Sequence, residues 1–97
     1  MFARTTTMQL KIAFIDDALT VYMNSIVPAA RSQKGFLELN LLLDRNTGKA
    51  ISMAIWESEK DAKANEESHY YQEQLVKLLS FYAYPPIKEG FEVYFKE

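Results

Sequence analysis

Aliphatic and polar residues alternate in two neighbouring stretches near the middle of the chain. Together these stretches run from Gly35 to Ser58, and a short polar segment, Asn46-Thr47-Gly48, separates them. A three-residue loop that ends on a left-handed glycine is a common hairpin connection. The pattern therefore predicts an antiparallel hairpin in which Leu43 lies opposite Ile51.

Side chains alternate across a strand, so this register divides the hairpin into two faces. The first face is wholly aliphatic: Leu39, Leu41, Leu43, Ile51, Met53 and Ile55. The second face is mixed: Phe36, Glu38, Asn40, Leu42, Ser52, Ala54 and Trp56. We expect helices to pack on the aliphatic face.

The residues before the hairpin predict a strand and a helix. Residues 2–12 are rich in β-branched side chains and contain no glycine or proline, which is typical of a strand. Asp16-Asp17 then favours a helix start, and an apolar stripe at helical spacing runs from Leu19 to Ala30. Pro28 predicts a kink in this helix, and Gly35 is expected at its C′ position.

The residues after the hairpin predict a divided helix and a last strand. Ser58 and Asp61 form a helix-start motif, and Ser68 is expected to cap a second helical piece. Tyr84-Pro85-Pro86 is predicted to end that piece in an extended link. Alternation in residues 91–96 predicts the final strand.

This order of elements, β-α-β-β-α-β, predicts an α+β fold of the ferredoxin-like type in a single domain, residues 1–97. Helices in this topology cover one face of the sheet. Because the other hairpin face carries apolar side chains, we expect a homodimer packed sheet against sheet. A monomer whose C-terminal tail folds over the sheet is the alternative.

Composition excludes several kinds of site and partner. The net charge is −2 with scattered Lys and Arg, so a nucleic-acid partner is not expected. The chain has no cysteine, which excludes disulfides, thiolate metal sites and thiol catalysis. No segment resembles a signal peptide or reaches transmembrane length, so no membrane partner is expected and the predicted location is the cytoplasm.

Few side chains offer acid–base chemistry. His69 is the only histidine, hence the only side chain that ordinarily titrates near neutral pH. Extending the apolar stripe of the second helix backwards places it off the core face, so a solvated role stays open beside a catalytic one. Glu38 is a second candidate base beside Trp56, with a structural hydrogen bond or a dimer salt bridge as the alternative.

Aromatic residues predict either a pocket or an ordinary core. Candidates for the walls of an aromatic pocket are Trp56, Tyr22, Tyr70, Tyr71 and Tyr82. Because an aromatic stripe at helical spacing is typical of core packing, both interpretations stay open. Neither a metal-ligand spacing, a glycine-rich phosphate loop nor a Ser-His-Asp arrangement is present.

Five short motifs follow one another along nearly the whole chain. They are Arg31 to Phe36, Leu42-Leu43-Asp44 with Thr47-Gly48, Trp56-Glu57-Ser58, Ser68 to Gln72, and Phe91 to Tyr94 after Pro85-Pro86. In this order and spacing the chain resembles the antibiotic biosynthesis monooxygenase domain family of the dimeric α+β barrel superfamily. The resemblance implies homodimers whose sheets form a barrel. It also implies oxygenases that oxidise polycyclic phenols or quinols without metal or flavin, with a haem-degrading branch beside them.

The resemblance also implies where polar site residues lie. Many quinol-oxidising relatives carry a histidine and then Ser-Pro-His-Phe after the hairpin tryptophan. Counted from Trp56, those positions hold Asn65 and then Ser68-His69-Tyr70-Tyr71, so neither histidine is matched and His69 takes the proline position. The Trp and His of the haem-degrading branch fall on Asn65 and Leu75, so haem degradation is not expected.

The resemblance to this family predicts a cofactor-independent monooxygenase that acts on an aromatic, quinol- or phenol-like small molecule. The alternative is a non-catalytic dimeric module that binds small molecules or takes part in a stress response. A third hypothesis is an isomerase or lyase that acts on a small cyclic acid. The predicted polar contacts are Asn65 and Tyr70, the proton carrier His69, and the pocket walls Trp56, Tyr71 and Tyr22.

Overall fold

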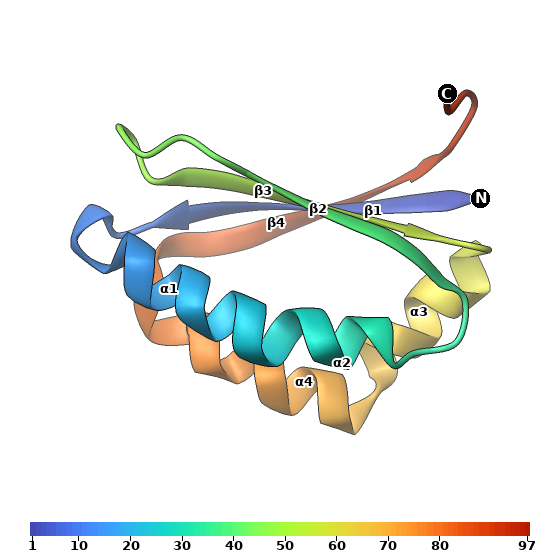
Figure 1. The fold of residues 1–97 in the computed structure, drawn as a ribbon, viewed down its shortest axis with the longest axis horizontal. Coiled ribbons are helices and arrows are strands. Elements are labelled where there is room, and N and C mark those ends of the chain that lie inside the picture. The colour runs from blue at the N-terminus through green and yellow to red at the C-terminus, as the bar shows by residue number, and fades with distance from the viewer.

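Four antiparallel strands form one sheet, and all the helices lie on one of its faces (Figure 1). A computed structural model describes all 97 residues. The strands are β1 (Phe2–Leu10), β2 (Phe36–Leu43), β3 (Lys49–Trp56) and β4 (Tyr82–Glu92), in the spatial order β2-β3-β1-β4. The predicted α+β ferredoxin-like fold is confirmed.

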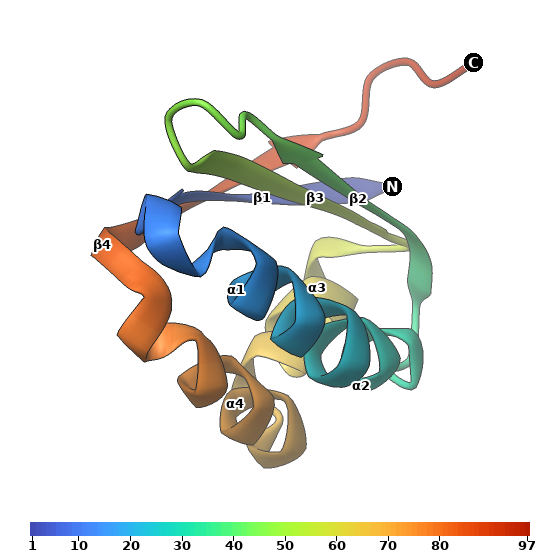
Figure 2. The ribbon, with the colours of Figure 1, turned by 60° about the vertical axis from the view of Figure 1, so that its left-hand side comes forward.

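Two helical segments cover the sheet, and they lie side by side beneath it (Figure 2). The first contains η1 (Ile12–Phe14), α1 (Ile15–Val21), η2 (Tyr22–Ile26) and α2 (Val27–Arg31). The second contains α3 (Glu59–Glu67), α4 (His69–Leu75) and η3 (Val76–Phe81). No helix is both long and apolar enough to cross a membrane.

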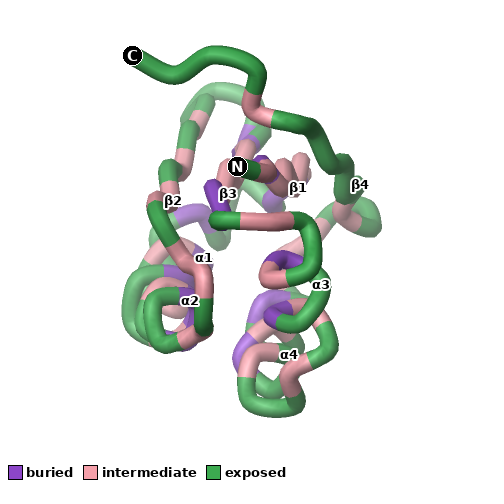
Figure 3. Tube along the Cα trace, turned by 90° about the vertical axis from the view of Figure 1, so that its right-hand side faces the viewer, coloured by how far each residue is buried: buried purple, intermediate pink, exposed green.

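The hydrophobic core lies between the sheet and the helices, where Figure 3 shows the buried positions. Its buried members are Met8, Leu10, Ile15, Ala18, Tyr22, Ile26, Ala50 and Leu78. Core residues of β1 alternate along the strand as predicted, since Met8 and Leu10 share one face.

The predicted hairpin register is wrong by one residue. Leu43 lies opposite Ala50 and not opposite Ile51, and five residues, 44–48, lie between the two strands. The Asp44 carboxylate accepts a hydrogen bond from the backbone N–H of Asn46, and the Asp44 carbonyl accepts one from Gly48. These two bonds extend the turn, while Gly48 does adopt the predicted positive φ, at 82°.

The corrected register exchanges the faces of β3. Leu39, Leu41 and Leu43 share the helix-covered face with Ala50, Ser52, Ala54 and Trp56. Ile51, Met53 and Ile55 lie on the outer face with Glu38, Asn40 and Leu42. Small side chains on the covered face of β3 leave room for aromatic side chains from the helices. Trp56 is therefore an interior residue and not part of the outer face.

The first helix continues past Pro28, as predicted. The five residues before α2 form a π-helical turn, Tyr22–Ile26, and the helix continues to Arg31. Proline has no N–H to donate and its ring crowds the preceding turn, which accounts for the wider turn there.

Both ends of the first helical segment differ from the sequence expectations. Asp16 and Asp17 lie in the first turn of α1, and neither caps it, because the N-cap is Phe14. α2 ends before Ser32, so Gly35 is not its C′ residue. Gly35 instead forms the turn into β2 with φ 84°, where a side chain would overlap that of Asp61.

The second helical segment begins as predicted. The Ser58 hydroxyl accepts the Asp61 N–H at 3.1 Å, and the Ser68 hydroxyl accepts the Tyr71 N–H at 3.4 Å. Its end was predicted wrongly, because β4 already begins at Tyr82 and finishes at Glu92. Pro85 and Pro86 fit within this strand, since β4 lies at the sheet edge and its pairing with β1 is irregular between Thr7 and Gln9.

The C-terminal residues turn back toward the outer face of the sheet. Lys96 Nζ lies 3.1 Å from Glu38 Oε1, which lowers the pKa of that carboxyl together with the Asn40 side-chain amide. Tyr94 and Phe95 nevertheless remain 96% and 77% exposed. The tail of one chain thus covers only part of this face.

Candidate functional site

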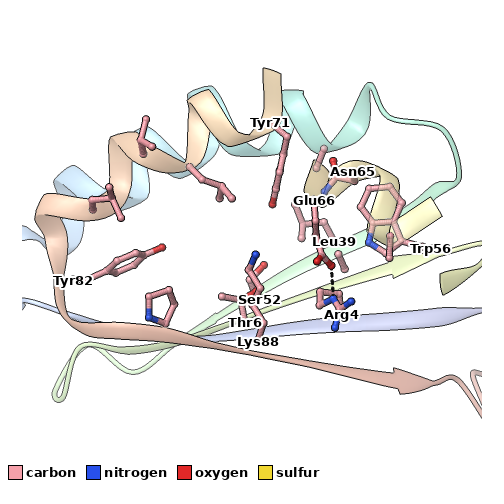
Figure 4. A pocket seen from close by; sticks show the side chains of 17 residues that line it. Arg4, Thr6, Leu39, Ser52, Trp56, Asn65, Glu66, Tyr71, Tyr82 and Lys88 are labelled. Carbon is pink, nitrogen blue, oxygen red and sulfur yellow. Dashed lines mark hydrogen bonds and ion pairs between the residues drawn. The ribbon is translucent and has the colours of Figure 1, made fainter. Parts of the chain in front are cut away.

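A cavity of about 220 Å³ lies between the sheet and the second helical segment (Figure 4). Seventeen residues line it, ten of them hydrophobic, and they come from all four strands and from helices of both segments. We call this space the site cavity. Its volume is below the roughly 300–1,000 Å³ of sites for drug-sized ligands, so it suits a molecule of one or a few rings.

The inner end of the site cavity is formed by buried residues. Trp56 is 2% exposed, and its ring meets Phe36 edge-on at a centroid distance of 5.7 Å. Asn65 projects from α3 and is 4% exposed. Its Oδ1 atom is buried without a hydrogen-bond partner. An unpaired buried acceptor is unfavourable by about 1–3 kcal/mol, so Asn65 is suited to accept a hydrogen bond from a bound molecule.

An ion pair stands beside this inner end. Arg4 Nε on β1 donates to Glu66 Oε1 on α3 at 2.6 Å. The Arg4 guanidinium also lies 5.2 Å from the centroid of the Phe2 ring. Gly90, opposite Arg4 on β4, makes room for it, since an added Cβ would stand 2.7 Å from Arg4 Nη1. Glu66 and Phe2 therefore hold the Arg4 guanidinium, and Gly90 leaves space for it.

Tyrosine hydroxyls gather in and beside the site cavity. Burial is the main cause that raises the pKa of Tyr71 to about 12, and the charge of the nearby Tyr22 raises it further. A side-chain hydrogen bond with Asn65 lowers this pKa and so opposes part of the rise. Burial, with Tyr22 as a second cause, also raises the pKa of Tyr82. Figure 4 shows Tyr71 extending into the cavity from α4 and Tyr82 from the start of β4. Both phenols therefore stay protonated at neutral pH and can donate hydrogen bonds.

Tyr22 is hydrogen-bonded to Ser52, a residue that lines the site cavity. Its hydroxyl lies 2.6 Å from the hydroxyl of Ser52, and Ser52 is a lining residue. Burial raises the pKa of Tyr22, and the hydrogen bond to Ser52 opposes that effect. The pair fixes the rotamer of Ser52 on the floor of the site cavity.

The opening of the site cavity lies between η3 and β4. Among the lining residues only Val76, Leu79 and Lys88 are exposed, with Val76 at 58% and Leu79 at 61%. Lys88 lies opposite Thr6 in the sheet, and its side chain extends from β4 toward the space below the helices (Figure 4). A molecule entering here passes an apolar helix edge and one ammonium group.

The polar atoms of the lining suit an organic ligand. They belong to an amide, two phenols, two hydroxyls, an ion pair and one ammonium group. No group of three or more His, Cys, Asp or Glu side chains gathers anywhere in the chain. The site cavity thus offers hydrogen bonds and aromatic contact to a small molecule.

Comparisons with known structures identify the fold. A putative antibiotic biosynthesis monooxygenase from Nitrosomonas europaea is similar over 98% of this chain and 100% of that one, with a TM-score of 0.83 at 14% identity. SnoaB, a cofactor-independent oxygenase from Streptomyces nogalater, is similar over 98% and 94%, with a TM-score of 0.84 at 11% identity. The chain has the fold of the antibiotic biosynthesis monooxygenases.

A third structure with this monooxygenase fold contains a bound ligand. It is the monooxygenase from the ActVA-Orf6 gene of Streptomyces coelicolor in complex with Nanaomycin D, with a TM-score of 0.76 at 19% identity over 93% of this chain and 84% of that one. The resemblance inferred from the five sequence motifs is therefore confirmed at the level of the fold.

Two uncharacterized proteins are similar to part of this chain in sequence. The uncharacterized protein Rv2557 of Mycobacterium tuberculosis is 30% identical over 67 residues, which are 69% of this chain and 30% of that protein. Rv2558 of the same organism is 27% identical over 67 residues, 28% of its length. The chain thus spans less than a third of these relatives. No family model matches the sequence.

The structure brings together only some of the predicted site residues. Asn65, Trp56 and Tyr71 line the site cavity, and Tyr22 reaches it through Ser52. His69 and Tyr70 do not line it and are exposed, Tyr70 at 52%. Ser68 restarts the helix so that Tyr71 and Leu75 face inward, which turns the first two residues of α4 outward.

Sequence reasoning missed five polar lining residues, namely Arg4, Thr6, Ser52, Glu66 and Lys88. A signal for Arg4 was present, because it alternates with Met8 and Leu10 on the covered face of β1, where a charged residue is unusual. Glu66 gave no such signal, since its partner lies 62 residues away.

Proposed function

We propose that this chain binds a small phenol- or quinol-like molecule in the site cavity and oxidises it with molecular oxygen, as a cofactor-independent monooxygenase. The observation that supports this most directly is the unpaired, buried Oδ1 of Asn65 in a largely apolar, aromatic-lined space. A phenolic O–H would satisfy this acceptor, and Trp56 and Tyr71 would contact the rings.

Oxygenation without a cofactor requires an electron-rich substrate that reacts with oxygen directly. In the proposed reaction a ring methylene group and O₂ give a ketone and water, so the substrate supplies all the electrons. Removing the phenolic proton starts the reaction, because the anion donates an electron far more readily than the phenol. The protein's part is to bind the ring, exclude water and accept this proton.

Glu66 is the proton acceptor that we assign, because it is the only carboxylate in the lining. An ordinary phenol has a pKa near 10, so a carboxylate can take its proton only where the resulting anion is stabilised. The guanidinium of Arg4, 2.6 Å from Glu66, would provide positive charge for that anion. The assignment uses neither His69 nor Tyr70, since both side chains are exposed outside the cavity.

A second candidate function is ligand binding without chemistry. The site cavity contains no histidine, which is the side chain best matched to proton transfer near neutral pH. A protein that only binds aromatic molecules would need the same walls and the same Asn65 contact, but it would consume no oxygen.

Oxygen uptake distinguishes the two functions. A panel of reduced quinols and anthrones is supplied to the wild-type chain and to Asn65→Ala and Glu66→Gln, with the exposed Tyr70→Phe and His69→Gln as matched controls. We expect uptake above the spontaneous rate that falls at least tenfold in the first two variants and stays unchanged in the controls. Binding of the panel without any uptake would favour the non-catalytic function.

We also propose that two copies of the chain pack with their outer sheet faces together. No helix covers this face (Figure 1), and Leu42, Ile51, Thr7 and Ile87 form one row across it. Leu42 and Ile87 at its two ends are 60% and 61% exposed. Such an apolar row on a sheet face supports a protein partner, and a second copy offers the complementary surface.

A further inference from the structure

Charges in the site cavity are unevenly balanced. Three charged residues line it, and two of them, Arg4 and Glu66, neutralise each other in the ion pair of 2.6 Å. Lys88 forms no ion pair. The whole chain carries a net charge of −2, so the single uncompensated charge in the cavity has the opposite sign to the protein.

Lys88 also occupies a defined place relative to Asn65. It is one of the three exposed lining residues and therefore lies at the opening, whereas Asn65 is 4% exposed at the inner end. In the sheet, Thr6 pairs with Lys88 and Arg4 pairs with Gly90. Lys88 is thus the diagonal neighbour of Arg4, at roughly 7–8 Å between backbones. Arg4 pairs with Glu66, the residue after Asn65 on α3, so it connects Lys88 at the opening with Asn65 at the inner end.

From this arrangement we infer that the ligand is a hydroxylated aromatic acid, with its hydroxyl group on Asn65 and a carboxylate on Lys88. This inference rests on the proposed binding of a phenol in the site cavity and adds the anionic group that the phenol carries. The apolar rings lie between the two polar ends, against Trp56 and Tyr71. Because the carboxylate lies at the opening, it keeps part of its hydration and avoids the free-energy cost of full burial.

The geometry also explains how the orientation of the ligand is selected. In the reverse orientation the carboxylate would lie at the buried inner end beside the ionised Glu66 carboxylate, which already neutralises Arg4, so the loss of its hydration would not be compensated. The hydroxyl group would then meet only Lys88, and Asn65 Oδ1 would remain unpaired. Lys88 is therefore a specificity-determining residue that binds the carboxylate, and Asn65 binds the hydroxyl group at the other end of the ligand.

Calorimetric titration at neutral pH tests this inference with three probes of the same ring system. They are 6-hydroxy-2-naphthoic acid, its neutral methyl ester and 2-naphthol. An exposed ion pair contributes modestly, so we expect the acid to bind about two- to fivefold more tightly than the ester at low salt, with a smaller difference at high salt. Lys88→Gln should abolish the preference, and Lys88→Glu should reverse it.

Lys60 provides a matched control for the change in net charge. It is exposed on α3, lines no part of the site cavity and forms no ion pair. We expect Lys60→Gln and Lys60→Glu to keep the wild-type preference for the acid. Equal losses in the Lys60 and Lys88 variants would overturn the inference, because long-range charge would then explain the preference.

The remaining outcomes separate this inference from the proposed function. If all three probes bind equally well to the wild-type chain, the anionic ligand is wrong and the aromatic site stands. If Lys88→Gln keeps the preference, the assignment of Lys88 is wrong. If none of the probes binds, the proposed phenol site itself fails. Binding of 2-naphthol to each variant shows that the site cavity is intact.

Discussion

Arg4 on β1 and Glu66 on α3 form an ion pair of 2.6 Å between residues 62 positions apart. Their side chains are only 20% and 26% exposed, so solvent screens the pair less than a surface pair. The pair ties the sheet to the helix that carries Asn65. It is therefore a structural link as well as a feature of the site cavity.

Removing the charge of Glu66 should destabilise the fold, because Arg4 is then left half-buried without its counter-ion. We expect Glu66→Gln to lower the free energy of unfolding by about 1–2 kcal/mol. Urea denaturation followed by tryptophan fluorescence measures this change, since Trp56 is the only tryptophan.

Glu59→Gln is the matched control for this prediction. It removes the exposed pair of Glu59 and Lys63, which are 3.8 Å apart on the same helix. Such a pair contributes about 0.3–0.5 kcal/mol. If both variants lose equally little stability, the Arg4–Glu66 pair is no stronger than an exposed one.

Tyr22 and Ser52 link the first helical segment to the floor of the site cavity through hydroxyls 2.6 Å apart. We expect Tyr22→Phe to lower the unfolding free energy by about 1 kcal/mol, because it leaves the Ser52 hydroxyl without its partner. Ser52→Ala in the Tyr22→Phe background should then cost little more. A double-mutant cycle by urea denaturation measures the coupling, and strictly additive effects would contradict the hydrogen bond.

Tyr71 makes stability depend on pH in the alkaline range. Its pKa rises from the usual 10.0 to about 12, so the folded state keeps the phenolic proton longer than the unfolded chain does. The stability from this residue is complete below pH 10 and falls as the pH rises toward 12. We expect a loss of up to about 2 kcal/mol across this window, measured by urea denaturation at several pH values.

Tyr71→Phe should make the alkaline loss smaller, because phenylalanine has no proton to release. Tyr22 and Tyr82, whose pKa values burial also raises, should leave a residual loss in this variant. Tyr70→Phe serves as the control, since Tyr70 is 52% exposed outside the cavity. An unchanged alkaline slope in Tyr71→Phe would contradict the assignment.

Local chemistry made part of this fold predictable. Ser58 and Ser68 cap the helices that follow them, because a serine hydroxyl satisfies N–H groups only a few residues away. The register of the hairpin could not be predicted from neighbouring residues alone. It depends on the turn bonds of Asp44 and on the hydrogen bond from the Leu10 N–H to the Gly48 carbonyl, which joins the turn to β1.

The candidate site was predictable only where its residues lie close together along the chain, between Trp56 and Tyr71. Asn65 followed from the family resemblance counted from Trp56, Tyr71 followed from the aromatic stripe, and all three residues line the site cavity. Helical spacing, extended backwards from the apolar stripe, had already placed His69 off the core face, and this side chain is exposed outside the cavity. Lys88 could not be found, because it meets the cavity through pairing of β4 with β1 and the predicted strand began after it.

The outer sheet face gives the last prediction, which concerns the homodimer. Leu42 and Ile87 stand at opposite ends of one row across this face, at 60% and 61% exposure. We expect the wild-type chain at micromolar concentration to sediment with twice the mass of 11.2 kDa. Leu42→Asp and Ile87→Asp should shift it to the monomer mass, because each buries a carboxylate in an apolar interface.

Met23→Asp is the control that locates the interface. Met23 is 57% exposed on η2, on the helical side of the molecule, so the same change there leaves the outer face intact. We expect this variant to remain dimeric. A wild-type chain that sediments as a monomer would exclude the sheet-against-sheet dimer, and dissociation by Met23→Asp alone would move the interface to the helices.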